Sequence, residues 1–203
     1  MLRCSLIVLI QSCREKHLMN AIQPSASNGP RYDLATMSFH WATAVLVVTL
    51  FATAQIWSFL AKGTPLRHNL QGLHISLGIL LTAAIVGRLL WRLTRGRRLA
   101  SHQGMAGLAA KAGHGLLYAL LLTQIVLGFM FRWAQGESFD FFGLFAVPAL
   151  MAPNPDWKHT LGGLHENVAW ALIILSGLHA CVALLHHWWL KDGVLLRMIP
   201  ENR

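Results

Sequence analysis

The chain contains little charge and very few acidic residues. Only 12 % of its 203 residues are charged, 8 Asp and Glu stand against 17 Lys and Arg, and 55 % are hydrophobic. So low a charged fraction excludes a soluble domain of ordinary composition. The alternation of polar and apolar residues that marks the strands of a membrane β-barrel is also missing. The composition therefore predicts an all-α protein that lies in a lipid bilayer.

Cysteine is scarce and poorly placed for covalent chemistry. The chain has three, Cys4, Cys13 and Cys181. None lies in a loop expected on the outer side of a membrane, so no structural disulfide is expected. No CxxC or CxxCH motif occurs, which argues against covalent attachment of a c-type haem.

Four apolar stretches are long enough to cross about 30 Å of hydrocarbon as helices. We expect them to form one domain over residues 31–203, an integral membrane four-helix bundle, with Asp33 placed to cap the first helix. Residues 1–30 hold only a five-residue apolar run, and we expect a disordered N-terminal extension or an over-long start there. The stretches run from Phe39 to Leu60, Leu73 to Trp91, Gly113 to Phe131 and Leu164 to Leu190.

The net charge of +9 raises the possibility of nucleic-acid binding, but the positions of the cations argue against it. Most Lys and Arg lie before the first stretch, between the second and third, and after the fourth. All three segments are on the same side of a four-span bundle. The positive-inside rule then predicts that both termini are cytoplasmic, and the distribution of charge argues against a nucleic-acid partner.

Histidines occur at matched depths in this bundle. His165 and His179 are fourteen residues apart in the last stretch, which is about 40° short of four helical turns, so both lie on one face about 21 Å apart. His40 is at the inner end of the first stretch, and His74 is at the outer end of the second. The spacing predicts two pairs, His40 with His179 and His74 with His165.

Two such pairs fit two stacked iron porphyrins, each held by two imidazoles. Iron with two imidazole ligands has no open axial position, so it passes electrons but does not readily bind oxygen. The alternative metal function is zinc transport, which favours carboxylates beside the histidines, and only Glu166 is close. We therefore expect His40, His74, His165 and His179 to be the metal ligands of two haems.

Other residues lie at the same two depths. Arg88 follows His74 by fourteen residues, so it is either a snorkelling arginine at a helix end or the partner of an inner haem propionate. His114 is expected to be a polar neighbour of the inner site rather than a ligand. Gly128 lies where a bulky side chain would collide with the outer cofactor. Part of the connection over residues 132–161 is apolar and is expected to cover the outer site.

With these residues in view, the chain resembles the bacterial di-haem cytochrome b561 family over about residues 31–200. The resemblance implies a four-helix cytochrome in the inner membrane of a bacterium, with two b haems ligated from the first, second and fourth helices. It rests on Ser38-Phe39-His40-Trp41, His74 with Arg88, Gly113-His114 with Tyr118, Leu164-His165-Glu166, Gly177-Leu178-His179, His186-His187-Trp188-Trp189-Leu190-Lys191-Asp192, and Leu195-Leu196-Arg197-Met198.

The family's activity implies that superoxide gives its electron to the outer haem and that ubiquinone is reduced near the inner one. On that basis His186, seven residues after His179, is the candidate quinone contact, able to hydrogen-bond a carbonyl or deliver a proton. Lys62, Arg67 and Lys158 are either solvated loop residues or steer the anionic donor. The alternative function is a haem-carrying anchor that relays electrons between quinone and a redox partner protein, a dehydrogenase or hydrogenase.

Overall fold

The computed structural model describes residues 31–97, 99 and 104–200. The predicted N-terminal extension, residues 1–30, lies outside these residues. The described chain divides into two compact units. The first covers Tyr32–Val182, and the second contains Arg31 together with the residues from Ala183 onward.

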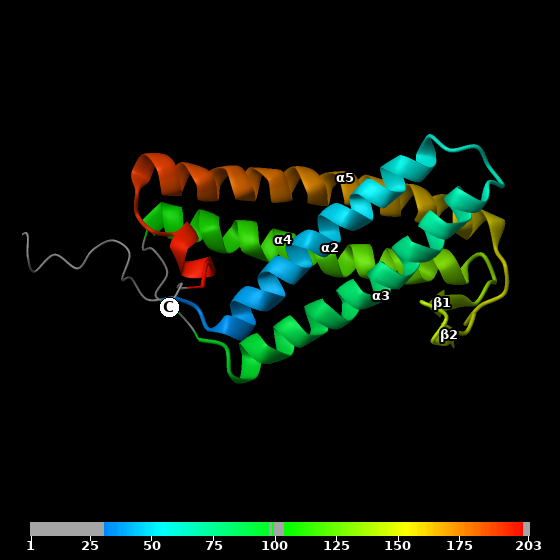
Figure 1. The fold of residues 1–203 in the computed structure, drawn as a ribbon, viewed down its shortest axis with the longest axis horizontal. Coiled ribbons are helices and arrows are strands. Elements are labelled where there is room, and N and C mark those ends of the chain that lie inside the picture. The colour runs from blue at the N-terminus through cyan, green and yellow to red at the C-terminus, as the bar shows by residue number, and fades with distance from the viewer. Residues whose placement is uncertain (1–30, 98, 100–103, 201–203) are drawn as a thin grey trace, which may run out of the picture. The chain divides into compact units, whose positions relative to one another are not determined.

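Four long helices make up the first unit, and the last of them continues into the second (Figure 1). All four are long and apolar enough to cross a membrane, which confirms the predicted all-α, four-span architecture. Each begins or ends beyond its apolar stretch, because polar residues extend its turns. The helices are α2 (Leu34–Ser58), α3 (Pro65–Thr94), α4 (Gly104–Trp133) and α5 (Pro155–Leu185).

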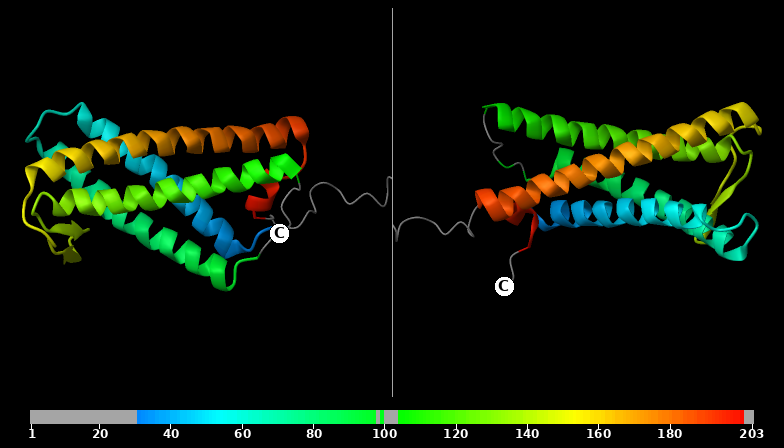
Figure 2. Two further views of the ribbon diagram at one scale, coloured as in Figure 1. Left: turned by 180° about the vertical axis from the view of Figure 1, so that it is seen from behind. Right: turned by 90° about the horizontal axis from the view of Figure 1, so that it is seen from above.

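The core of the first unit is thin. One cluster of buried side chains draws on all four helices, and large apolar side chains such as Val45 and Ile174 point outward with 63 % and 59 % of their surface exposed. In water so much exposed apolar surface would cause association, whereas a bilayer solvates it. Figure 2 shows in two further views that the long helices cross one another obliquely. The core cluster is Leu50, Leu81, Ile85, Leu121 and Leu172.

Asp33 caps α2, as predicted, and also holds the end of α3. Its carboxylate accepts the Thr36 N–H at 2.9 Å and the Thr36 hydroxyl at 2.7 Å. It further accepts the Trp91 indole N–H at 2.7 Å and the Arg97 backbone N–H at 3.1 Å. Partial burial on its own would raise the pKa of Asp33, but these four hydrogen bonds to the carboxylate hold it well below its usual value.

The connection between α4 and α5 contains a β-hairpin that was not expected. Strands β1 (Phe139–Phe141) and β2 (Phe145–Val147) pair antiparallel, with Phe139 opposite Val147. Phe142 and Gly143 turn the chain with φ of 49° and 70°, the left-handed conformation that tight hairpin turns need. Strands of three residues are too short to show an alternating pattern of polar and apolar residues, so this hairpin could not be predicted from the sequence.

In the second unit, α5 passes into a π-helical turn, His186–Leu190, which ends at Lys191 with φ of 50°. A short 3₁₀ helix, Leu195–Met198, follows. The Arg31 guanidinium donates to the Ile199 carbonyl at 3.1 Å, so the first described residue is tied to the chain's last segment.

Candidate haem sites in the helix bundle

The structure brings the four candidate ligands together in the two expected pairs. His40 of α2 faces His179 of α5, with ring centres 6.3 Å apart. His74 of α3 faces His165 of α5, also with ring centres 6.3 Å apart. We call these the inner pair and the outer pair, after the sides on which they are predicted to lie.

The separation of the rings fits a metal ion between each pair. Two metal–imidazole bonds of about 2 Å each, with the short distance from each ring nitrogen to its ring centre, sum to about 6 Å. Both measured separations equal 6.3 Å, although the pairs are formed by different helices. Each pair would therefore be able to hold a haem iron between its two imidazoles.

The hydrogen bonds of His74, in the outer pair, determine which of its ring nitrogens carries the proton. Its Nδ1 lies 3.0 Å from the Leu50 carbonyl, which can only accept, so Nδ1 carries the proton and donates it. The Thr53 hydroxyl, 3.2 Å from the same nitrogen, donates to Leu50 as well. The lone pair is thereby left on Nε2, and histidine ligands of metals are usually oriented by such a second hydrogen bond. The Trp57 ring packs edge-on against His74 at 4.9 Å.

His165, the other member of the outer pair, is held by α4. The Gln124 amide nitrogen lies 3.1 Å from His165 Nε2. A Cβ on Gly128 would lie 3.2 Å from His165 Cε1, and the Phe131 ring stacks on the imidazole at 6.5 Å. His165 Nδ1 is buried without a hydrogen-bond partner in the described part of the chain. A buried nitrogen of this kind fits a site that an additional ligand completes.

The inner pair has a third histidine beside it. His114 of α4 lies 5.3 Å from the His179 ring and donates its Nδ1 proton to the Ala110 carbonyl at 2.6 Å. A ring separation of 5.3 Å is too short for one metal ion to be bonded to both His114 and His179. It is compatible with the predicted role of His114 as a polar neighbour. On the other side, the Trp41 ring stacks on His40 at 5.3 Å.

Arg88 lies over an aromatic ring instead of extending along its helix. Its guanidinium carbon is 5.3 Å from the centre of the Tyr118 ring of α4, a cation–π contact. Both Arg88 Nε and the Tyr118 hydroxyl are buried, and neither has a hydrogen-bond partner of good geometry among the described residues, although the two side chains attract each other. Two buried donors of this kind are able to bind an anionic group, which is one of the two predicted roles of Arg88.

The three candidate steering residues differ in their surroundings. Lys62 and Lys158 are exposed. Arg67 donates from Nη1 to the Trp57 carbonyl at 2.7 Å and to the Leu60 carbonyl at 2.8 Å. It therefore hydrogen-bonds one carbonyl in the last turn of α2 and one just beyond the helix, a role that the sequence pattern did not indicate.

The hairpin is attached to α3 two residues beyond His74. The Ser76 hydroxyl donates to the Asp140 carbonyl at 3.2 Å and accepts the Phe142 N–H at 3.0 Å. Only 3 % of Ser76 is exposed, and Phe139 of the hairpin is buried against Phe129 of α4. The connection thus packs against the outer ends of α3 and α4, as its apolar residues suggested.

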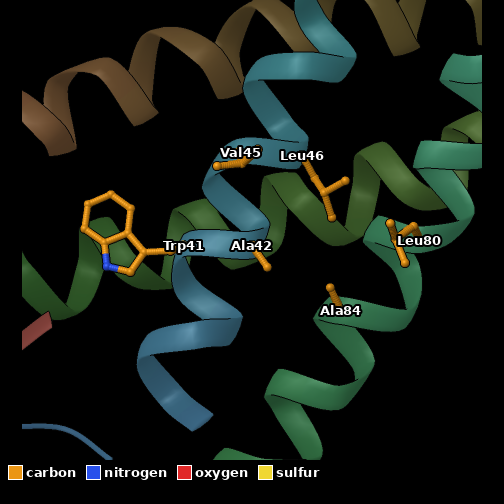
Figure 3. A pocket seen from close by; sticks show the side chains of 6 residues that line it. All are labelled: Trp41, Ala42, Val45, Leu46, Leu80 and Ala84. Atoms are coloured by element: carbon orange, nitrogen blue, oxygen red, sulfur yellow. The ribbon is translucent and has the colours of Figure 1, made fainter. Parts of the chain in front are cut away.

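An apolar groove of about 470 Å³ lies between α2 and α3 (Figure 3). It begins one residue after His40. Apart from the Trp41 indole nitrogen, its side chains offer no hydrogen-bonding group, so it provides space for hydrocarbon rather than for a polar ligand. The lining residues are Trp41, Ala42, Val45 and Leu46 from α2 and Leu80 and Ala84 from α3.

His186, the candidate quinone contact, belongs to the second unit. Its Nδ1 lies 2.5 Å from the Asp192 carboxylate, across the π-helical turn. That contact gives Nδ1 the proton and leaves Nε2 as an acceptor when the ring is neutral.

The zinc alternative finds no support in the donor set. Structural and catalytic zinc sites use three or four protein ligands. Among the described residues, His, Cys, Asp and Glu side chains form no group of three or more that could hold a metal ion, and Glu166 is exposed.

Comparison with known proteins gives consistent relatives along the whole bundle. Residues 31–201 match the family described as prokaryotic cytochrome b561. The chain is 37 % identical over 181 residues to cytochrome b561 homolog 2 of Escherichia coli (strain K12), covering 88 % of this chain and 96 % of that protein. It is 29 % identical over 175 residues to the probable superoxide oxidase CybB of Yersinia pestis, covering 85 % and 98 %. Cytochrome b562 of Cereibacter sphaeroides is 27 % identical over 177 residues, covering 84 % and 96 %.

Proposed function

The chain belongs to the prokaryotic cytochrome b561 family of membrane electron carriers, and on this premise we propose that it oxidises superoxide and reduces ubiquinone. Electrons enter at the outer pair, His74 and His165, and leave from the inner pair, His40 and His179. The observation that carries the two-haem part of the proposal is the equal 6.3 Å separation of the rings in both pairs. Haem b, which the family implies, supplies reversible one-electron transfer at each pair.

The protein's own groups orient the ligands and neutralise charge. The Leu50 carbonyl fixes the ring of His74, and Trp41 stacks on His40. Arg88 and Tyr118 present buried donors, which we assign to a haem propionate at the inner level. The hairpin clasped by Ser76 covers α3 beside His74 and limits access of water there.

Superoxide as the donor is supported by the relative named a probable superoxide oxidase, which is 29 % identical. Lys62 and Lys158 are exposed cations on the predicted outer side, where an anion would arrive. We propose that they raise the local concentration of superoxide, and that Arg67 contributes through its charge while it caps α2.

Ubiquinone reduction requires protons as well as electrons, and His186 is proposed to supply the contact. Asp192 accepts the Nδ1 proton of His186 and orients the ring. In the protonated ring Nε2 donates to a quinone carbonyl, and the Asp192 carboxylate stabilises the imidazolium that this requires.

The purified chain in lipid nanodiscs tests the proposal. We expect steady generation of superoxide to reduce the haems, and added ubiquinone to reoxidise them, with superoxide dismutase abolishing both signals. The His74→Ala variant is the matched control, because it removes an outer ligand and should prevent reduction by superoxide. Haems that ignore superoxide but accept electrons from a partner dehydrogenase would contradict the proposal and support the relay anchor instead.

A further inference from the structure

Thr53 places a buried hydroxyl on the side of α2 that meets α3. Only 6 % of the residue is exposed. Its hydroxyl donates to the Leu50 carbonyl at 2.9 Å, three residues earlier in the same helix. A threonine inside a helix often satisfies its hydroxyl in this way. The local bond uses the hydroxyl proton and leaves the lone pairs of the Thr53 oxygen available to a further donor.

That further donor is a ligand ring of the outer pair. His74 Nδ1 lies 3.2 Å from the Thr53 hydroxyl oxygen and 3.0 Å from the Leu50 carbonyl oxygen. The three atoms form a closed triangle, because Thr53 is bonded to Leu50 as well. The Nδ1 proton therefore meets two oxygen atoms. Both lie at Nδ1 and neither involves Nε2, the nitrogen whose lone pair is left for iron.

A second buried threonine of α2 makes the same kind of local bond. Thr43, of which 4 % is exposed, donates to the Phe39 carbonyl at 2.7 Å. A buried hydroxyl in an apolar helix is thus satisfied by a backbone carbonyl of its own helix. The contact of Thr53 with His74 is additional to such a bond, so the need to satisfy the hydroxyl does not account for it.

We propose that Thr53 is a positioning residue for His74 and lowers the reduction potential of the outer haem, a proposal that rests on the proposed ligation by His74. Acceptors at the Nδ1 proton make the iron-binding nitrogen more basic. A more basic ligand stabilises ferric iron, which carries one more positive charge than ferrous iron. The hydroxyl strengthens the acceptor that Leu50 provides, because a hydroxyl that donates its own proton becomes a better acceptor. Thr53 thereby favours transfer of the electron from the outer haem to the inner one.

Three variants of the purified full-length chain test this assignment. Thr53→Val replaces the hydroxyl by a methyl group, Thr53→Ser keeps a hydroxyl, and Thr43→Val removes the matched hydroxyl elsewhere in α2. The measurements are haem per chain and a potentiometric titration that resolves both haems. For Thr53→Val we expect the equilibrium constant for reduction of the outer haem to rise about fivefold, as the loss of one of two acceptors allows. Tenfold is about 59 mV for one electron, so fivefold is about 41 mV.

The pattern across the variants separates the hydroxyl from the shape of the side chain. Thr53→Ser and Thr43→Val should each keep that constant within about twofold of wild type, and the inner haem should not change. A fall in potential in Thr53→Val would show that the hydroxyl competes with His74 for the Leu50 carbonyl, and it would overturn the proposal. A change below about twofold in Thr53→Val, or an equal rise in Thr53→Ser or Thr43→Val, would overturn it as well.

Loss of the outer haem from Thr53→Val is also informative. Retention of this haem near the wild-type potential in both Thr53→Ser and Thr43→Val would then support positioning through the hydroxyl, and any other result for those two variants would contradict it. A wild-type chain without two haems would instead refute the proposed function.

Discussion

The contact between Gly128 and His165 predicts how much bulk the outer site tolerates. A Cβ at Gly128 would lie 3.2 Å from His165 Cε1 and 3.7 Å from Nδ1. Carbon atoms pack best at about 3.5 to 4.0 Å, so Gly128→Ala requires the ring to move by a few tenths of an ångström. Metal–ligand distances tolerate about 0.2 Å. Gly128→Ala should therefore keep the outer haem but alter its spectrum. The spectral change is expected although alanine itself stabilises a helix by about 1 kcal/mol relative to glycine.

A leucine at the same place adds three further carbon atoms in the direction of the ring. Overpacking a closed site of this kind costs about 1 to 3 kcal/mol. The His165 ring is also in contact with Gln124 and Phe131. We expect Gly128→Leu to bind one haem per chain and to keep the inner haem unchanged. The assay is a pyridine haemochrome determination of haem per chain, combined with a redox titration.

The control is Gly72→Leu in α3. Gly72 is exposed, and nothing lies within 4 Å of the Cβ that would be added there. It should bind two haems with the wild-type spectrum. Two unaltered haems in Gly128→Leu would show that His165 is not held against α4 in the way we describe.

Three further outcomes follow from other parts of the chain. His186→Ala should keep both haems, since His186 is not an assigned ligand. It should slow quinone reduction by about 10²-fold or more, as the loss of a general acid does. Loss of a haem in this variant would instead identify His186 as a ligand. Charge reversal at Lys62 or Lys158 should slow reduction of the outer haem by superoxide at low salt in stopped-flow mixing, and rates insensitive to salt and to charge would leave both as solvated residues. The depressed pKa of Asp33 contributes stability that is present above its unfolded pKa of about 3.9 and lost as pH falls below it. Asp33→Asn should remove that part of the acid sensitivity in thermal unfolding between about pH 2 and 5, and an unchanged profile would refute the link.

The helices and the pairing of histidines were predictable because both follow from short-range periodicity. Fourteen residues between His165 and His179 place them on one helix face whatever surrounds them. The alternation of helix direction then assigns His74 and His40 to the two depths. The ends of the helices were less predictable. α3 begins at Pro65, not near Leu73, because the helix continues through polar residues outside the apolar stretch.

Contacts between distant segments could not be predicted in this way. The cap that Arg67 provides for α2 depends on how the first connection folds back. The hairpin depends on positive φ at Phe142, a residue that gives no sign of it in the sequence. The contact of Gln124 with His165 had a signal, an amide within an apolar run, but the partner 41 residues away became evident only when α4 and α5 were placed together.

Counting haems in ligand variants tests the central claim most directly, because the claim is that four histidines form two independent pairs. Wild type should contain two haems b per chain. His40→Ala and His179→Ala should each lose the same haem, and combining them should remove no more. His40→Ala combined with His74→Ala should remove both. One haem in the wild type, or a second haem lost when His40→Ala and His179→Ala are combined, would contradict the account.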